Sequence, residues 1–267
     1  MQEYPTRYEL QRLAETAGRA MLKYFGQELN VTLKDDNTPL TIVDTLINKT
    51  VLEYFEQNYP HIHVVGEEGN REVADAEYTV LCDPIDGTSP YSLWIPVSAF
   101  AITVLKDGEP FLAVIHDPFL KRTWIGEKGK GTALNARPVR VSEARSLHGS
   151  NVMLVKWKGC GFNLDWVETK LGHKDAKVQN LTSLAYFGGL IASGLVEASI
   201  FPGTGLLETA AMQVIVEEAG GLVTDLFGNR IVYSREHNYR HTYGSLASNK
   251  WLHEELLKLT NPTFVPK

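Results

Sequence analysis

The sequence predicts a mixed protein, with an α+β first half and an α/β second half. In the first half two helical patterns precede a series of apolar runs that follow one another directly, as strands do. In the second half apolar runs alternate with helical patterns, which is typical of an α/β unit. We expect two subdomains, over residues 1–145 and 146–267, although no linker rich in Pro or Gly separates them.

Two helices are expected near the start of the chain. Apolar residues recur at helical spacing over 13–24, and Gly26 follows as a helix stop. A second helical pattern covers 43–54 and closes at a Tyr-Pro pair. The polar stretch 29–39 between the two patterns is expected to form a loop or a short hairpin.

The remaining elements follow from short apolar runs and small-residue helical patterns. The strands expected in the first half are 63–65, 78–82, 97–105, 110–116, 122–126 and 139–141. The strands expected in the second half are 151–155, 198–201, 222–224 and 244–248. The helices expected there are 183–195, 208–219 and 250–259.

The composition is that of an ordinary globular protein, for which we expect a cytoplasmic location. Of 267 residues, 43% are hydrophobic and 22% are charged. A net charge of −6 argues against a broad nucleic-acid surface, so nucleic acid is not an expected partner. No apolar run approaches the ~20 residues of a membrane helix, so a membrane is not expected either. The two cysteines are too few for a disulfide framework.

Acidic residues follow two of the expected strands at the point where each strand ends. A Glu-Glu pair stands at 67–68, and the motif DPIDGT stands at 83–88. If the strands are neighbours, four carboxylates converge at one sheet edge, and their repulsion favours cations between them. Mg²⁺ prefers carboxylate, carbonyl and water oxygens. Asp83 and Asp86 could then face one metal pair, with the carbonyl of Ile85 as a further ligand.

Each acidic segment also has an ordinary structural explanation. An acidic pair after a strand is usually a solvated loop or a helix cap. A D-x-x-D-G-T segment by itself is an acceptable turn, in which Pro stiffens the backbone and Gly permits an unusual geometry. The two segments together, each at the end of an apolar run, favour a chemical role.

These motifs resemble the signature of the inositol monophosphatase-like family of metal-dependent, lithium-sensitive phosphatases. Residues 34–44 (KDDNTPLTIVD) resemble the family's K-x-D-x-S-P-V-T-x-x-D segment. Residues 126–135 (GEKGKGTALN) resemble its G-x-G-A-x-x-N turn, and 247–249 (ASN) resemble the residues before its last helix. The regions occur in the family's order over most of the chain.

The resemblance implies a fold, a reaction and a partner. The implied fold is a layered αβαβα sandwich of the inositol monophosphatase/fructose-bisphosphatase type. The implied activity is Mg²⁺-dependent hydrolysis of a small phosphomonoester, and a homodimer is the family-like assembly. Two or three Mg²⁺ ions would lower the pKa of the attacking water, neutralise the phosphate and stabilise the leaving alkoxide.

The resemblance also implies roles for individual residues. The implied metal ligands are Glu67, Asp83, the Ile85 carbonyl, Asp86 and Glu208. Thr88, held with Asp44, is implied to orient the attacking water, with Glu67 as a base. The implied substrate contacts are Asp86, Gly87, Thr88, Ser183, Leu184 and Glu208. Glu68 is the more distant member of the acidic pair in this comparison.

The chain departs from the family pattern mainly on the substrate side. Glu208 stands where the family has the Asp of W-D-x-A-A, and is either a ligand or substrate-hydroxyl contact, or merely an acid at a helix start. Phe201 stands where the family has an acid that holds sugar or inositol hydroxyls. Trp94 replaces a Gly, and 89–91 (SPY) replaces Asn-Phe. These changes argue against myo-inositol phosphate itself.

Several readings of the function therefore stay open. The leading one is a phosphatase, whose substrate is inositol-phosphate-like or a less usual alcohol phosphate, such as histidinol phosphate, a sugar phosphate or an antibiotic-pathway intermediate. The alternative is a weakened family member that binds metal and ligand in a regulatory role. Lys156 is expected to be a solvated charge. The tryptophans are expected in the core or at an interface: Trp94, Trp124, Trp157, Trp166 and Trp251.

Overall fold

The computed structural model describes most of the chain. The described residues are 2–27, 32–33, 39–157, 160–203, 205–235, 239, 243–260 and 263, with the backbone alone described at 32–33 and 39–40. Lys34, Asp36 and Thr38 of the upstream family-like segment lie outside these residues. Within the described part of the chain, no helix combines the length and the apolar character needed to cross a membrane.

The larger sheet has the strand order β10-β9-β8-β7-β6-β5-β3-β4. Its strands are β3 (His63–Gly66), β4 (Gly69–Arg71), β5 (Tyr78–Asp86), β6 (Ala99–Lys106), β7 (Glu109–Asp117), β8 (Arg122–Glu127), β9 (Gly131–Leu134) and β10 (Arg137–Pro138). Neighbouring strands are antiparallel, apart from β3 and β5, which are parallel. β5 is buried along its whole length, which explains its continuous apolar run.

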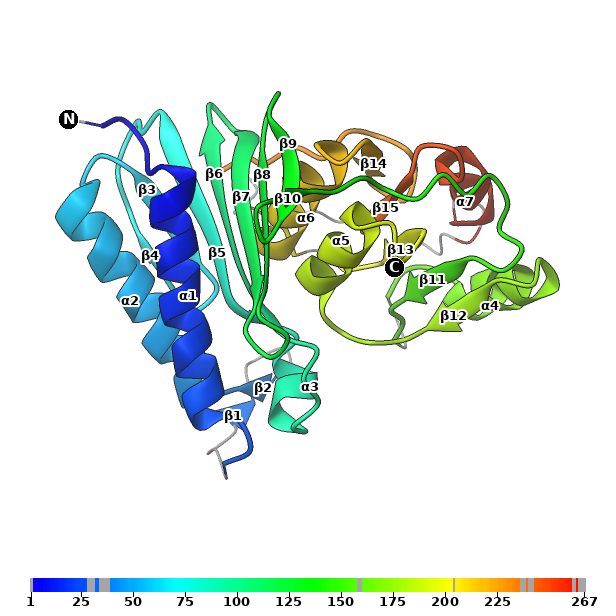
Figure 1. Cartoon of the computed structure of the whole chain (residues 1–267), viewed down its shortest axis with the longest axis horizontal. Helices are drawn as coiled ribbons and strands as arrows, with labels where there is room; N and C mark the ends of the chain where they lie inside the picture. Colours follow the sequence, from blue (N-terminus) through cyan, green and yellow to red (C-terminus); the bar gives the residue numbers. More distant parts are fainter. Residues whose placement is uncertain are drawn as a thin grey trace.

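Two helices cover one face of the larger sheet. They are α1 (Arg7–Tyr24) and α2 (Ile42–Asn58), which pack on β5, β6 and β7 through one apolar cluster (Figure 1). Each helix begins with a capping box, formed by Thr6 with Glu9 and by Thr41 with Asp44. Between them, β1 (Thr32–Leu33) and β2 (Pro39–Leu40) form a small antiparallel pair.

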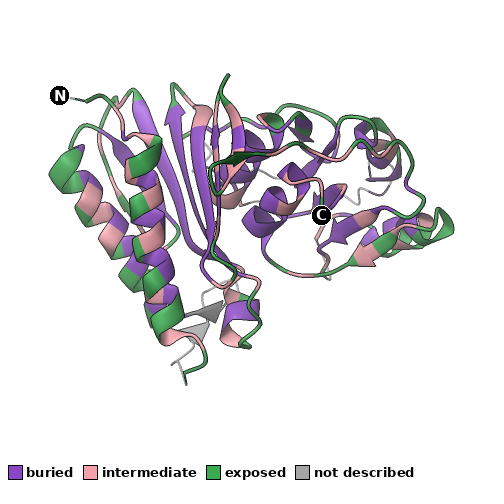
Figure 2. Ribbon diagram, in the orientation of Figure 1, coloured by how far each residue is buried: buried purple, intermediate pink, exposed green. Residues whose placement is uncertain are grey.

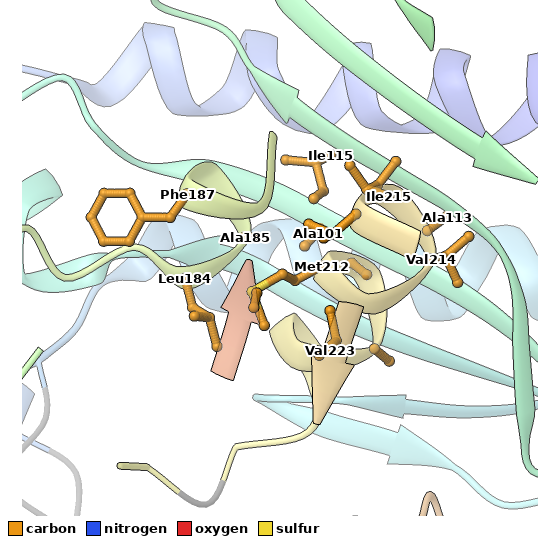
Figure 3. Packing of buried hydrophobic residues seen from close by; sticks show 14 of the residues in the cluster. Ala101, Ala113, Ile115, Leu184, Ala185, Phe187, Met212, Val214, Ile215 and Val223 are labelled. Atoms are coloured by element: carbon orange, nitrogen blue, oxygen red, sulfur yellow. The ribbon is translucent and has the colours of Figure 1, made fainter. Parts of the chain in front are cut away.

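Two further helices cover the opposite face of the larger sheet. α5 (Leu184–Ala192) and α6 (Leu207–Glu217) lie between the two sheets and share one apolar cluster with both (Figure 3). Their close approach depends on small residues. A Cβ added at Gly188 would lie 2.7 Å from Met212 Cγ, and one at Gly189 would lie 2.6 Å from the Trp124 ring.

The smaller sheet has the strand order β12-β11-β13-β15-β14. Its strands are β11 (Asn151–Leu154), β12 (Lys177–Gln179), β13 (Ala198–Phe201), β14 (Gly221–Thr224) and β15 (Ser245–Asn249). β12, β11 and β13 are parallel, and β15 runs antiparallel to β13 and β14.

A last pair of helices covers the outer face of the smaller sheet. They are α4 (Leu164–His173) and α7 (His253–Thr260), which contribute to the third apolar cluster. The molecule is therefore a five-layer αβαβα sandwich, and this confirms the expected fold. Figure 2 shows the result, with the central strands and central helices buried and with outer helices exposed on one side.

Several sequence-based boundaries were wrong. The DPIDGT motif at 83–88 does not begin as a turn. Its first four residues belong to β5, which continues to Asp86 and has a bulge between Asp83 and Asp86. The short helix α3 (Thr88–Ser92) follows. The stretch 139–141 is not a strand, and β9 and β10 precede it. The elements α4, β4, β9, β10 and β12 were missed, because short or half-exposed segments carry a weak periodic signal.

Candidate active site

The Glu-Glu pair and the DPIDGT motif leave the larger sheet side by side. β3 and β5 are parallel, with Gly66 opposite Cys82, and the Glu67 N–H donates to the Cys82 carbonyl at 3.2 Å. Glu67 and Asp83 therefore follow neighbouring positions at the same edge. The neighbouring strands that the sequence argument required are present.

Asp44 brings a third acidic segment to this edge. Its Oδ2 accepts hydrogen bonds from the Thr41 N–H at 2.9 Å and from the Thr41 hydroxyl at 2.5 Å, which holds the carboxylate in the first turn of α2. The Thr88 hydroxyl lies 3.0 Å from the Ile85 carbonyl and 3.4 Å from Asp44 Oδ1. Thr88 and Asp44, predicted to act together, are thus in contact.

Carboxylate oxygens of Asp44, Glu67 and Glu68 all lie within 4.8 Å of one another. Burial raises the pKa of Asp44 to about 6, and the charges of Glu67 and Glu68 add to this effect, while the Thr41 hydrogen bonds oppose it. A close, oxygen-only set of this kind has the donor chemistry of a hard divalent cation such as Mg²⁺. The donor chemistry of this set therefore fits the predicted metal, and of the predicted ligands the set contains Glu67.

Asp83 is an acid whose pKa is raised by its burial and by the charges of four other acidic residues. Burial raises its pKa well above the ordinary value, and neighbouring charges raise it further, namely those of Glu67, Asp86, Glu208 and Asp44. Its Oδ1 accepts the Ile85 N–H at 3.0 Å, which holds the bulge of β5 in shape. Acidic side chains from α2, from the β3 and β5 edge and from α6 therefore act on one buried carboxylate.

Asp86 caps the helix α5 from a distant part of the chain. Its carboxylate accepts the Ser183 hydroxyl at 2.5 Å, the Leu184 N–H at 3.0 Å and the Ala185 N–H at 2.7 Å. Burial raises the pKa of Asp86, and these hydrogen bonds act in the opposite direction. Ser183 and Leu184, predicted as substrate contacts, are thus brought to the acidic cluster, where both donate to Asp86.

Gly87 packs closely against the residues that precede α5. Its φ is +85°, and an added Cβ would lie 2.8 Å from Ser183 Cβ and 3.0 Å from the Thr182 carbonyl. The Ser98 hydroxyl donates to the Gly87 carbonyl at 2.8 Å. Both the backbone angle and the missing side chain are required there.

Glu208 reaches the cluster from the first turn of α6. No side chain caps this helix at Leu206. The Glu208 carboxylate lies over Gly205, where an added Cβ would be 2.3 Å from Oε1. Since the charge of Glu208 raises the pKa of Asp83, its carboxylate acts on the cluster.

Asn48 is a site residue that the sequence argument missed. Its Nδ2 donates to the Gly69 carbonyl at 3.2 Å, and its Oδ1 accepts the Glu68 N–H at 3.4 Å. An added Cβ at Gly66 would lie 2.0 Å from the same Oδ1. Asn48 therefore holds the turn that carries the Glu-Glu pair, and its spacing of four residues from Asp44 on α2 was the available signal.

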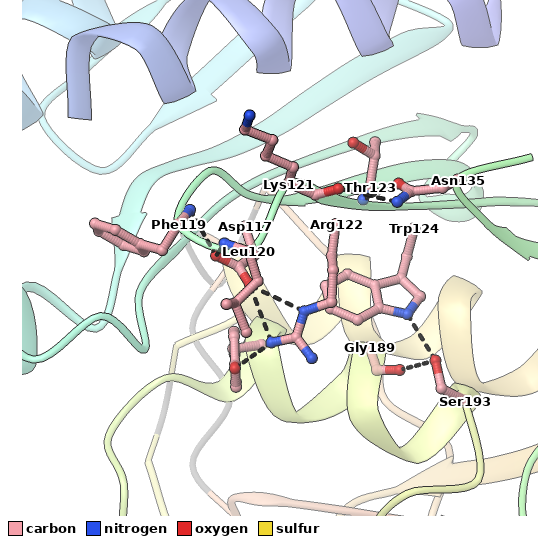
Figure 4. Close-up of polar contacts among 11 residues, drawn as sticks. Asp117, Phe119, Leu120, Lys121, Arg122, Thr123, Trp124, Asn135, Gly189 and Ser193 are labelled. Atoms are coloured by element: carbon pink, nitrogen blue, oxygen red, sulfur yellow. Dashed lines mark hydrogen bonds and ion pairs between the residues drawn. The ribbon is translucent and has the colours of Figure 1, made fainter. Parts of the chain in front are cut away.

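A second polar network fixes α5 against the larger sheet (Figure 4). Arg122 pairs with Asp117, with Nε at 3.0 Å and Nη2 at 2.9 Å from Oδ2, and it also donates to the Tyr186 hydroxyl. The Trp124 indole N–H donates to Ser193 Oγ at 2.8 Å. The helix that Asp86 caps is thus held at several points along its length.

The five tryptophans are expected in the core or at an interface. Trp124 is fully buried, which confirms the core expectation for this residue. The other four are exposed on the single chain, so they lie outside its core, and their place at an interface stays a prediction: Trp94 (54%), Trp157 (47%), Trp166 (37%) and Trp251 (44%).

Comparisons with known proteins bear on the family and the fold of the chain. The family model described as inositol monophosphatase family matches residues 4–263. The chain is 30% identical over 260 residues to the histidinol-phosphatase of Mycobacterium tuberculosis, covering 93% of this chain and 95% of that protein. It is also 30% identical over 223 residues to the bifunctional phosphatase IMPL2, chloroplastic, of Arabidopsis thaliana. That match covers 83% of this chain and 64% of the Arabidopsis protein.

A solved structure has the same architecture. The Thermotoga maritima IMPase superposes with a TM-score of 0.86 at 25% identity, covering 96% of this chain and 97% of that one. The sequence motifs, the five layers and the match over nearly the whole chain lead to one assignment. The chain belongs to the inositol monophosphatase family and is a phosphoric monoester hydrolase.

Proposed function

We propose that the chain is a Mg²⁺-dependent phosphatase that hydrolyses a small alcohol phosphate with water as the nucleophile. The observation that carries this proposal is the convergence of buried carboxylates, with the pKa values of Asp44 and Asp83 raised. Like charges at this spacing either take up protons, as the raised pKa values indicate, or are neutralised by cations. The phosphatase names of the relatives support a phosphomonoester substrate.

The proposal gives each residue a task. The metal ligands are Glu67, Asp83, the Ile85 carbonyl, Asp86 and Glu208. When bound, Mg²⁺ would lower the pKa of the attacking water, neutralise the phosphate and stabilise the leaving oxygen. The Thr88 hydroxyl, held 3.4 Å from Asp44 Oδ1, orients the water, and Glu67 accepts its proton.

The substrate contacts belong to the proposal as well. They are Asp86, Gly87, Thr88, Ser183, Leu184 and Glu208. Ser183 and Leu184 lie at the start of α5, where the hydroxyl of one and the N–H of the other donate to Asp86. The proposal further includes a homodimer in the cytoplasm, with subdomains over 1–145 and 146–267.

Release of inorganic phosphate tests the proposal directly. The full chain is incubated with a panel of phosphomonoesters in Mg²⁺ and in chelator. We expect phosphate release in Mg²⁺ and none in chelator. In Glu67→Gln we expect the rate of phosphate release in Mg²⁺ to fall by roughly 100-fold or more. Glu53→Gln is the matched control, since this exposed residue of α2 pairs with Lys49 across one helix turn.

The alternative function predicts a different result. A weakened family member would bind Mg²⁺ and a phosphate ester without releasing phosphate, and Glu67→Gln would then change binding alone. Binding without turnover across the whole panel would contradict the proposal.

A further inference from the structure

Two aromatic side chains lie together at one edge of the smaller sheet. Phe201 ends β13, and Trp157 follows β11 by three residues. The two strands are parallel, with Leu154 opposite Ile200, so both rings lie beyond the same edge. Their centroids are 5.9 Å apart, with ring planes at 58°. Trp157 is 47% exposed, so this pair presents ring surface outward.

This edge is also the one that meets the carboxylates. The chain leaves β12 there and reaches Ser183, whose hydroxyl donates to Asp86. It leaves β13 there and reaches Glu208 through the short segment 202–206. Because all three strands are parallel, their carboxyl ends open toward the same site.

Two glycines between β13 and α6 approach the Phe201 ring and the Glu208 carboxylate. An added Cβ at Gly203 would lie 2.2 Å from Phe201 Cε1, and one at Gly205 would lie 2.3 Å from Glu208 Oε1. Two residues of chain span at most about 7 Å. The Phe201 ring and the Glu208 carboxylate therefore each lie beside one of two backbone positions that are at most about 7 Å apart.

The nearby cation has its partners on another side. The ammonium of Lys156, directly before Trp157, lies 2.5 Å from Asp165 Oδ1 and 2.6 Å from Glu168 Oε2 on α4. Its charge is compensated there. What Phe201 and Trp157 offer a ligand is aromatic surface.

We propose that Phe201 and Trp157 bind the alcohol half of the substrate, and that this half carries a planar aromatic or heteroaromatic ring. The inference rests on the proposed function, because that function puts the phosphate at the carboxylates. Aromatic rings gain energy from stacking or edge contact with another ring. A polyhydroxylated ring would instead give up hydrogen bonds to water against the face of Phe201 without replacing them.

Two pairs of esters test the preference in the full chain with Mg²⁺. The ring-bearing esters are benzyl phosphate and 2-(imidazol-4-yl)ethyl phosphate, and the polyol esters are glycerol 2-phosphate and myo-inositol 1-phosphate. We expect kcat/KM to be roughly tenfold or more higher for the ring-bearing esters. Equal values, or a preference for the polyol esters, would overturn the inference.

Variants then assign the preference to the two rings. Trp157→Ala and Phe201→Leu should each lower kcat/KM for benzyl phosphate by about tenfold while glycerol 2-phosphate changes by less than about twofold. Trp157→Phe should keep most of the preference. Trp157 is exposed, so its variants keep the test valid if Phe201→Leu is unstable. A uniform effect on both esters would contradict a role in specificity.

A matched control is another exposed tryptophan at the opposite edge of the same sheet. Trp251 follows β15, and Ser248 of β15 pairs with Ala198, where β13 begins. Trp251→Ala should leave both kcat/KM values unchanged. A loss specific to benzyl phosphate in this variant would overturn the assignment to Phe201 and Trp157.

Binding separates a failure of this inference from a failure of the proposed function. If no ester is hydrolysed, the proposed function fails. In that case, calorimetry in Mg²⁺ still measures the affinity of the chain for benzyl phosphate and for inorganic phosphate. We expect Trp157→Ala to weaken benzyl phosphate by about tenfold and to leave inorganic phosphate unchanged. Equal effects on the two ligands would overturn the inference.

Discussion

Asp44 and Asp83 are buried acids whose surroundings oppose their ionisation. The pKa of Asp44 is raised to about 6 by burial, and that of Asp83 is raised further by burial and by neighbouring carboxylates. For an acid with a raised pKa, the free energy of unfolding falls as pH rises from the unfolded pKa to the folded one. At neutral pH the metal-free site therefore costs stability, which bound cations would restore.

Gly87→Ala tests the close packing beside Asp86. Its added Cβ would lie 2.8 Å from Ser183 Cβ at a φ of +85°. Gly129→Ala is the matched control, because its φ is +76° and no atom of the residues that the structure describes lies within 4 Å of an added Cβ. We expect Gly129→Ala to lower the free energy of unfolding by about 1–2 kcal/mol, and Gly87→Ala by about 1–3 kcal/mol more. Denaturant unfolding measures both, and equal losses would contradict the packing argument.

At the scale of elements, the helices α5 and α6 begin without a local side-chain cap. Ser183 makes no capping hydrogen bond to its own helix, and Asp86 accepts the first N–H groups of α5 in its place. Leu206 cannot cap α6. Both helix starts therefore point at acidic residues, whose charge the positive end of the helix dipole stabilises.

Glu208→Asp and Glu208→Gln distinguish a chemical role from a simple helix-start acid. The charge of Glu208 acts on Asp83, so charge should matter more than length. We expect Glu208→Gln to lower phosphate release by roughly tenfold or more, with Glu208→Asp affected less. The loss of an acid near a helix start costs only about 0.3–1 kcal/mol of stability. Normal release by Glu208→Gln would show that Glu208 is a helix-start acid alone.

His253 gives α7 a dependence on pH. It is buried at the first position of the helix, between the Thr224 and Ser248 hydroxyls, and burial lowers its pKa to about 4. Because the folded pKa lies below the unfolded value of 6.5, stability is lost as pH falls from about 6.5 toward 4. We expect the wild type to lose about 2 kcal/mol more than His253→Gln between pH 7.5 and pH 4.5 in denaturant unfolding. An equal change in the free energy of unfolding between the two pH values in both proteins would contradict this expectation.

The whole molecule brings the site together from three layers. Acids come from α2, from the edge of the larger sheet and from α6 of the middle layer, and Asp86 joins that edge to α5. Ions bound there would join the larger sheet to the middle helices. Metal binding should therefore stabilise the whole fold, not one segment.

Thermal unfolding with Mg²⁺ checks this expectation. At a Mg²⁺ concentration about 100 times the dissociation constant, binding adds about 2.7 kcal/mol, which raises Tm by roughly 5–10 °C for a chain of this size. In Asp83→Asn we expect a higher metal-free Tm than in the wild type, because repulsion is relieved, and little or no rise with Mg²⁺. A full rise in Asp83→Asn, or a rise in wild type that chelator does not reverse, would contradict the metal site.

Much of the fold was predictable from local patterns. The helix over 43–54 and the strand over 198–201 were found because apolar residues at a fixed period mark the buried face of one element. The positions of the acidic segments after two apolar runs predicted their convergence on the condition that the two strands are neighbours, and the pairing of β3 with β5 meets this condition. The short α3 and the bulge in β5 were not, because Pro and Gly in the motif suggested an ordinary turn.

The amino-acid sequence by itself determined the order of the main elements, the family and the acidic motifs, since each depends on residues close together in the chain. Only the tertiary structure decided that Asp86 caps α5, because the Ser183 hydroxyl it accepts lies 97 residues away. The same holds for the charge of Glu208 acting on Asp83 and for Trp157 lying beside Phe201. Contacts between distant segments leave no periodic pattern in a single sequence, and packing of the layers alone brings them together.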